Sequence, residues 1–198
     1  MEQAGIALLG FVPWSDPDRG VAALENPAAL AAERCARALV EEGFPATFVP
    51  IRVSAEGIGQ AMEAIRRLQS TIVVALGQTS TEPRVERFGH VPGAWAPPTP
   101  GEQAPWLLAP DADDLAEALN GLSEVAAETL PCRASEDAGG YFCDHLCVEL
   151  VRESRRRPVR ARFLHVTAID GCSPEVREAR LRQYARQTRA VVDWLATG

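Results

Sequence analysis

The apolar positions of the chain alternate between short continuous runs and helically spaced stripes. Runs at 6–11, 47–53 and 71–77 have the length of buried strands. Between them, the segments 27–40 and 54–68 repeat apolar residues every three or four positions, which is typical of amphipathic helices. This alternation predicts an α/β fold, a three-layer sandwich with a mixed, mostly parallel central sheet and helices on both faces.

Capping and breaking residues place the ends of these elements. Asn26 followed by Pro27 is a typical helix start, and Gly43 is a typical residue just beyond a helix end. The periodicity assigns Val40 to the buried face of this first helix and Leu68 to that of the second. Pro50 cannot donate to a sheet ladder, so we expect its strand to lie at an edge or to contain a bulge.

The second half of the chain continues the pattern after an interruption. Residues 92–110 are rich in proline and hold Trp95 and Trp106, which favours an ordered loop that packs on its surroundings. Beyond it, a helix opens near Asp111 with Leu122 in its apolar stripe. The remaining elements that we expect are a short strand near 131–134, a helix from about 142, a strand at 160–166 and a last helix from 174.

Length and composition narrow the possible classes of protein. A chain of 198 residues with a globular hydrophobic content predicts one domain over residues 1–198. The net charge of −7 argues against nonspecific nucleic-acid binding, even though arginines cluster between 152 and 162. No apolar run could span a bilayer and no signal peptide is recognisable, so we expect no membrane partner and a cytoplasmic location.

Two residue counts bear on chemistry. The five cysteines are odd in number and lack paired metal-ligand spacing, so they read as reduced thiols rather than a disulfide framework. All 20 cationic side chains are arginines, because the chain contains no lysine. Schiff-base lysines, phosphate-binding lysines of P-loops and Ser–Lys dyads are therefore excluded.

One stretch, residues 135–146, organises the candidate chemistry. A turn-forming run there leads into an apolar-periodic helix, and Cys143 falls in the first helical turn. Free N–H groups and the helix dipole at such a position favour a thiolate, and can lower a thiol pKa from about 8.5 to about 3.5–7.5. The alternative interpretation is that Cys143 is a buried small residue without a chemical role.

A nucleophilic thiol needs a base and a group that orients the base. His165 near the end of a predicted strand is the candidate base, and Glu86 is the candidate orienting carboxylate. Glu82 and His145 are local competitors, although Glu82 precedes a proline and His145 would face another side of the helix from Cys143. A metal site formed with Cys147 lacks common spacing, so we expect no metal.

These blocks together resemble the pyroglutamyl peptidase I (pyrrolidone-carboxylate peptidase) family. The matching blocks run in the family's order over nearly the whole chain and are Gly10-Phe11-Val12-Pro13-Trp14, Asn26-Pro27, Gly77-Gln78, Glu86-Arg87, Ala138-Gly139 through Cys143-Asp144, and His165-Val166. The resemblance implies a phosphorylase/hydrolase-like fold. It also implies a cysteine peptidase that removes an N-terminal pyroglutamyl residue through Cys143, His165 and Glu86.

The resemblance further implies how a substrate would be held. The positions that match the family's ring pocket are Phe11, Trp14, Gln78 and Phe142, with Gln78 acting chiefly through its backbone. We expect the oxyanion hole at the start of the cysteine helix, where glycines 139 and 140 allow close approach of the backbone. The implied partner is a small peptide with a blocked N-terminus. No cofactor is implied, and homotetramers or dimers are an expectation.

Several positions depart from the family pattern. Trp14 is larger than the usual Phe, threonines and a serine at 79–81 stand where glycines are usual, and Arg162 replaces a glycine. Asp144 replaces an asparagine beside the nucleophile. If its carboxylate points toward the site it should raise the thiol pKa. Two alternatives therefore stay open: a related thiol hydrolase or amidase with altered acyl specificity, and a non-catalytic binding paralogue.

Overall fold

The computed structural model describes residues 5–13, 15–16, 21–22, 25–90, 106–122, 130–139 and 141–197, with the backbone alone at 15–16 and 21–22. Its helices are α1 (Pro27–Glu41), α2 (Ala55–Arg67), α3 (Ala112–Asn120), α4 (Phe142–Arg156) and α5 (Pro174–Thr197). Its strands are β1 (Gly5–Phe11), β2 (Ser15–Asp16), β3 (Val21–Ala22), β4 (Ala46–Ile51), β5 (Ser70–Thr79), β6 (Arg84–Glu86), β7 (Phe88–Gly89), β8 (Trp106–Leu107), β9 (Arg133–Ser135) and β10 (Arg160–Thr167).

Six strands form the central sheet in the order β4-β1-β5-β10-β6-β9. All neighbouring pairs are parallel except β10 and β6, which are antiparallel. The predicted mixed, mostly parallel sheet is therefore confirmed. Pro50 lies in β4, which is an edge strand of this sheet, as expected for a residue that cannot donate to a ladder.

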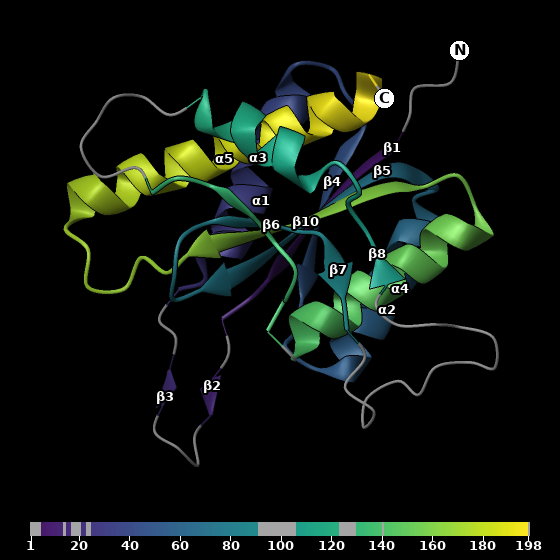
Figure 1. Cartoon of the computed structure of the whole chain (residues 1–198), viewed down its shortest axis with the longest axis horizontal. Coiled ribbons are helices and arrows are strands. Elements are labelled where there is room, and N and C mark those ends of the chain that lie inside the picture. Colours follow the sequence, from purple (N-terminus) through teal and green to yellow (C-terminus); the bar gives the residue numbers. More distant parts are fainter. Residues whose placement is uncertain are drawn as a thin grey trace.

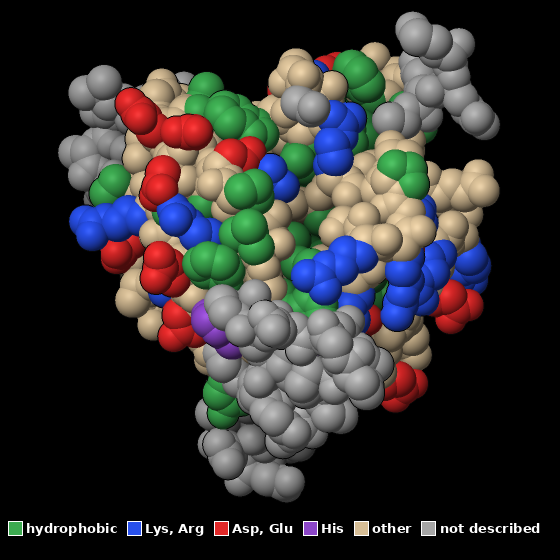
Figure 2. Space-filling model, turned by 45° about the vertical axis from the view of Figure 1, so that its right-hand side comes forward, with side chains coloured by type: hydrophobic (Ala, Val, Ile, Leu, Met, Phe, Trp, Pro, Cys, Tyr) green, Lys and Arg blue, Asp and Glu red, His purple; other side chains and the backbone are tan. Residues whose placement is uncertain are grey.

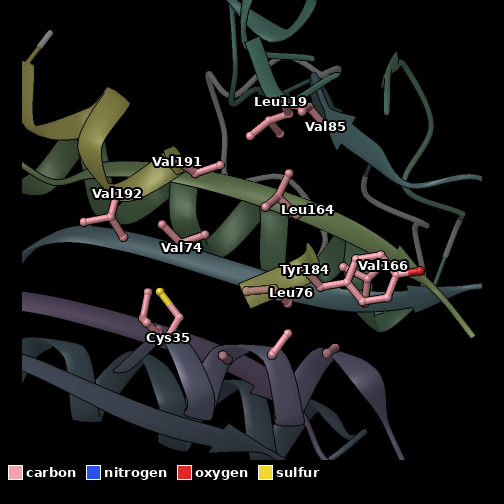
Figure 3. Close-up of a cluster of buried hydrophobic side chains, with 14 of the residues drawn as sticks. Cys35, Val74, Leu76, Val85, Leu119, Leu164, Val166, Tyr184, Val191 and Val192 are labelled. Atoms are coloured by element: carbon pink, nitrogen blue, oxygen red, sulfur yellow. The ribbon is translucent and has the colours of Figure 1, made fainter. Parts of the chain in front are cut away.

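The helices cover both faces of the sheet, so the three-layer prediction is also confirmed (Figure 1). α1, α3 and α5 pack on one face, where their apolar side chains meet those of the sheet in a continuous cluster. Figure 3 shows part of this cluster, with Cys35 of α1 opposite Val74, Leu164 and Val191. α2 and α4 cover the other face in a second cluster.

Side-chain caps explain where the first two helices begin. Asn26 Oδ1 accepts a hydrogen bond from the backbone N–H of Ala28 at 2.9 Å, and Pro27 takes the first helical position. Ser54 Oγ accepts from Gly57 N at 2.9 Å in the same way. Both predicted helix starts are therefore confirmed.

Three apolar residues that the periodicity assigned to helix faces are exposed instead. Val40 is 55% exposed, Leu68 is 42% exposed, and Leu122 lies beyond the end of α3 and is 44% exposed. All three stand at or beyond the C-terminal end of their helices. Periodicity shows which residues share a face, but not where the covering surface ends.

Arginines of the cluster between 152 and 162 make specific contacts. Arg157 and Arg66 both pair with Glu153, a carboxylate with only 2% exposure, and so tie α4 to α2. The guanidiniums of Arg152 and Arg155 lie 5.3 and 4.6 Å from the ring centroid of Trp106, which is fully buried. Trp106 thus packs as the sequence suggests, whereas Trp95 lies outside the described residues. On the face shown in Figure 2, basic side chains lie among acidic and apolar ones.

Arg162, which replaces a family glycine, joins the sheet to two helices. Its Nη2 donates to Asp111 Oδ2 at 2.8 Å, just before α3, and the same oxygen accepts from Trp194 Nε1 of α5 at 2.6 Å. Burial acts to raise the pKa of Asp111, but these two hydrogen bonds outweigh it and hold the pKa below its ordinary value. The substitution is therefore structural, on the face opposite to α4.

Candidate active site

The candidate site lies where the parallel strands end. After β1, the next strand of the chain in this sheet, β4, lies on one side of β1, and the one after that, β5, lies on the other side. The strand order therefore reverses at β1. In open α/β sheets, ligands bind outside the carboxyl ends of the strands at such a switch point. Phe11 ends β1, Gly77 lies near the end of β5, and His165 pairs with Gly77 across the β5–β10 ladder.

His165 and Glu86 form a buried pair. His165 Nδ1 lies 2.6 Å from Glu86 Oε1, and the two side chains are only 3% and 0% exposed. Because a carboxylate can only accept, Nδ1 carries the proton and Nε2 is left as the free basic nitrogen of the ring. Phe163 packs edge-on against the imidazole with a centroid distance of 5.0 Å, which further limits its rotation.

The surroundings of Gly77 show how close Cys143 lies to the His165–Glu86 pair. A Cβ placed on Gly77 would lie 3.0 Å from Cys143 Sγ and 3.0 Å from His165 Cδ2. The sulfur and that ring carbon are therefore no more than twice this distance apart. Cδ2 is bonded to Nε2, the ring nitrogen that the contact of Nδ1 with Glu86 leaves free. The thiol of α4 and the imidazole of β10 thus both lie beside Gly77, and Glu86 of β6 contacts the imidazole.

Cys143 occupies the predicted position in the first turn of its helix. α4 begins at Phe142, and its first N–H groups have no intrahelical acceptor. Such groups point at incoming negative charge, which is what an oxyanion hole requires. Gly139 just upstream has φ of +94°, a conformation that favours glycine. Gly140, also expected to contribute there, lies outside the described residues.

The expected lowering of the Cys143 pKa is wrong for this structure. Burial above all, together with the carboxylates of Glu86 and Asp144, raises the pKa of the thiol to about 12, against a lowering by Arg84. The helix terminus does not outweigh desolvation and two negative neighbours. The Cys143 side chain is therefore a neutral thiol at neutral pH, and it would need a base to act as a nucleophile.

Asp144 points inward rather than to solvent. Its side chain has no exposed surface, and its Oδ1 accepts a hydrogen bond from the backbone N–H of His90 at 3.0 Å. The ring of His90 in turn lies 2.6 Å, at Nε2, from the carbonyl oxygen of Glu136 in the loop before α4. Asp144 therefore anchors the segment after β7 over the start of the cysteine helix. The expectation that an inward-pointing Asp144 carboxylate raises the thiol pKa is therefore confirmed.

The competing residues lie elsewhere. Glu82 is 37% exposed and pairs with Arg133 at 3.7 Å rather than with His165. His145 is half-buried on α4, and burial lowers its pKa. Within the described part of the chain, no group of three or more His, Cys, Asp or Glu side chains could hold a metal ion.

The predicted pocket residues are placed unequally. Phe11 is 3% exposed and belongs to the apolar cluster under α2 and α4, against which Phe142 and Cys143 also pack. Gln78 is half-buried, and strand alternation turns its side chain to the opposite face from Gly77, which leaves its backbone for a ligand. Trp14 lies outside the described residues. Their contact with a substrate stays a prediction.

Sequence reasoning missed one charged residue of the site. Arg84 stands two positions before Glu86 on β6 and directly opposite His165 in the ladder. Alternation along a strand puts residues two apart on the same face, so the spacing of Arg84 and Glu86 contained the signal. Recognising it required knowing that this short segment is a strand paired with β10.

These features define an α/β three-layer protein with a thiol, a carboxylate-oriented imidazole and a helix N-terminus at one sheet edge. Enzymes that transfer acyl groups through a cysteine use this set of groups. Within the described residues, no helix is both long and apolar enough to cross a membrane.

Solved structures of pyroglutamyl peptidases share this fold. The chain aligns with pyroglutamyl peptidase I from Bacillus amyloliquefaciens at a TM-score of 0.66 and 20% identity, covering 94% of this chain and 95% of that one. The pyrrolidone carboxyl peptidase from Thermococcus litoralis gives a TM-score of 0.68 at 16% identity, with 98% and 96% covered. The one from Fervidobacterium islandicum gives 0.67 at 17% identity, with 98% and 99% covered. No protein-family model and no curated protein sequence matches the chain.

Proposed function

We propose that the chain is a cysteine-type omega-peptidase that removes an N-terminal pyroglutamyl residue from peptides. The observation that carries the proposal is the buried Glu86–His165 pair with the Cys143 sulfur beside the imidazole. The fold shared with pyrrolidone carboxyl peptidases supports the choice of substrate class.

Because the Cys143 thiol is neutral, it must lose its proton to a base during the first step of the proposed reaction. His165 Nε2 takes the thiol proton as Cys143 Sγ attacks the pyroglutamyl carbonyl, and backbone N–H groups in the first turn of α4 stabilise the oxyanion. The imidazolium then gives its proton to the departing amine, the peptide C–N bond breaks, and a thioester remains. Water attacks the thioester with His165 again as base, releasing pyroglutamate and the thiol. Glu86 keeps the imidazole oriented throughout.

One observation favours a second candidate, a related thiol amidase with altered acyl specificity. The segment after Gly77 carries Thr79, whose hydroxyl accepts from Arg84, in place of the small residues usual in the family. A cation and a threonine hydroxyl beside the end of β5 are unlike the mostly apolar pocket that a neutral lactam requires. A non-catalytic protein would retain the same thiol without turnover.

Turnover of pyroglutamyl-aminomethylcoumarin by the purified protein tests the proposal. We expect hydrolysis by the native chain and none by Cys143→Ala. Activity on N-acetyl-amino-acid or glutamyl amides of the same dye, with none on the pyroglutamyl compound, would favour the second candidate. No turnover of any of these amides would contradict both hydrolase assignments.

A further inference from the structure

Arg84 lies directly across the ladder from His165. The antiparallel register of β10 and β6 pairs these two residues, and directly opposed residues carry their side chains on the same face of a sheet. Glu86, two positions further along β6, shares that face. A short strand therefore presents a cation and a carboxylate side by side to the candidate base.

The Arg84 guanidinium is held at both ends. Its Nε lies 3.5 Å from Glu86 Oε1, the same oxygen that accepts from His165 Nδ1. Its Nη2 donates to Thr79 Oγ1 at 3.3 Å, two positions beyond Gly77 on β5. Thr79 is itself fixed by its contact with Thr81, 3.1 Å between the two hydroxyl oxygens. The arginine thus bridges β6 and the end of β5 across the histidine strand.

Burial makes Glu86 dependent on this cation. The Glu86 side chain has no exposed surface, and that of Arg84 is 25% exposed. Among the described residues, Arg84 Nε and Glu86 Oε2 are buried atoms that make no hydrogen bond. The ion pair between Arg84 and Glu86 is therefore not replaced by hydrogen bonds from other groups to these two atoms. A buried carboxylate that loses its cation is left uncompensated, which is costly in a low-dielectric site.

We propose that Arg84 is a positioning residue: it holds the Glu86 carboxylate where Glu86 orients His165 toward Cys143, and Thr79 holds Arg84 in turn. This inference rests on the proposed hydrolase function and adds a fourth residue to its site. Arg84 acts through Glu86 rather than by touching the reacting atoms.

The charges around the sulfur support this role. Glu86 and Arg84 face Cys143 from β6, Asp144 lies on its own helix, His165 faces it from β10, and the Cys147 thiol lies one turn along α4. Arg84 is the cation that opposes the two carboxylates, and its charge lowers the pKa of Cys143. Loss of Arg84 should therefore affect the thiol as well as the alignment of the base.

The first test is a double-mutant cycle on turnover of pyroglutamyl-aminomethylcoumarin. We expect Arg84→Met to lower kcat about tenfold with little change in KM, because a positioning group acts on the transition state. In a Glu86→Gln background the same change should cost less than about twofold, since no carboxylate remains to be held. Arg133→Met is the matched control: Arg133 pairs with Arg84 in the β6–β9 ladder but contacts Glu82 instead.

Three results would overturn the proposal. A raised KM with unchanged kcat would make Arg84 a substrate contact. An equal loss of kcat in both backgrounds would make its effect independent of Glu86. An unchanged kcat in Arg84→Met would show that Arg84 has no role in positioning the site. Thermal unfolding of each variant separates a loss of site geometry from a loss of fold.

A second readout does not depend on the substrate, so it separates failure of this inference from failure of the proposed function. The pH dependence of Cys143 alkylation by iodoacetamide should move to higher pH by about one unit in Arg84→Met. It should not move in Arg133→Met. If the native chain hydrolyses no pyroglutamyl amide but this shift is present, the arrangement around Glu86 stands while the assigned reaction fails. Superimposable curves would contradict the arrangement itself.

Discussion

Glu86 Oε1 and His165 Nδ1 lie 2.6 Å apart although 79 positions separate the two residues in the sequence. The antiparallel pairing of β6 with β10 brings them together, and this is the one antiparallel pair among the described strands of the central sheet. The orientation of the candidate base is therefore a property of the sheet rather than of a loop, and it should be sensitive to single substitutions on β5, β6 and β10.

Replacing Glu86 by Gln should lower kcat by at least about 100-fold while leaving KM nearly unchanged. The amide keeps the size of the side chain but removes the charge that orients and balances the imidazole. Steady-state kinetics on the pyroglutamyl amide check this. Glu82→Gln is the control, because Glu82 contacts Arg133 and should leave kcat within about twofold of the native value. Similar losses in both variants would contradict the assigned role of Glu86.

Gly77→Ala should abolish turnover. The added Cβ would lie 2.8 Å from Phe163 Cζ and 3.0 Å from both the Cys143 sulfur and His165 Cδ2, so the thiol and the ring must move away from the new methyl group. Gly59→Ala is the matched control, since a Cβ there meets nothing within 4 Å and an exposed helical alanine is favoured by about 1 kcal/mol. Kinetics and thermal unfolding should show lost activity only at position 77. Full activity of Gly77→Ala would place the sulfur away from the histidine.

Asp144→Asn should move the alkylation–pH curve of Cys143 to lower pH. The thiolate is the reactive form, and a carboxylate beside it raises the thiol pKa, so removing that charge gives thiolate at lower pH. Asparagine can still accept the hydrogen bond from His90 N, so the substitution removes the charge at position 144 and keeps the contact that anchors His90. Peptide mapping after limited alkylation follows Cys143, with half-buried Cys172 as the internal reference. Unchanged curves would mean that the Asp144 charge does not reach the sulfur.

Glu153→Ala should destabilise the fold without acting on the site. Burial acts to raise the pKa of Glu153, but hydrogen bonds from Arg66 and Arg157 outweigh it and hold the pKa below its ordinary value. The stabilisation from the ionised Glu153 carboxylate is thus fully present above the pKa that this carboxyl has in the unfolded chain. It is lost as pH falls through the lower pKa that the carboxyl has in the folded protein. We expect about 3 kcal/mol of lost stability at neutral pH.

Urea unfolding at neutral and acid pH measures this loss. Glu178→Ala is the control, because Glu178 pairs with Arg34 at the surface, where solvent screens the interaction, and should change stability little. A loss for Glu153→Ala that is the same at every pH would contradict an ionic origin.

Much of the fold could be predicted because local signals agree with the global arrangement. Asn26 caps the helix that it was expected to start, the second helix begins beside Ser54 where the segment 54–68 was expected to begin, and Pro50 lies in an edge strand. The exposed Val40 and Leu68 show the limit of periodicity, which carries no information on how far a neighbouring layer extends.

The site was predictable in its residue types but not in its electrostatics. Cys143 falls in the first turn of α4 and His165 near the end of β10, as their sequence contexts suggest. The pKa of the thiol depends on burial and on the distances to Glu86 and Asp144, which no local pattern encodes. Arg84 was missed because its role depends on the register of one three-residue strand with its neighbour.

The most direct measurement is the capture of an acyl-enzyme. The native chain is mixed with a pyroglutamyl peptide, quenched in acid within a single turnover, digested at low pH and mapped by mass spectrometry. The account predicts a mass gain equal to one pyroglutamyl acyl group on the peptide that contains Cys143, with none in Cys143→Ala. Hydrolysis of the peptide with no adduct at Cys143, or with the adduct on another cysteine, would contradict the account.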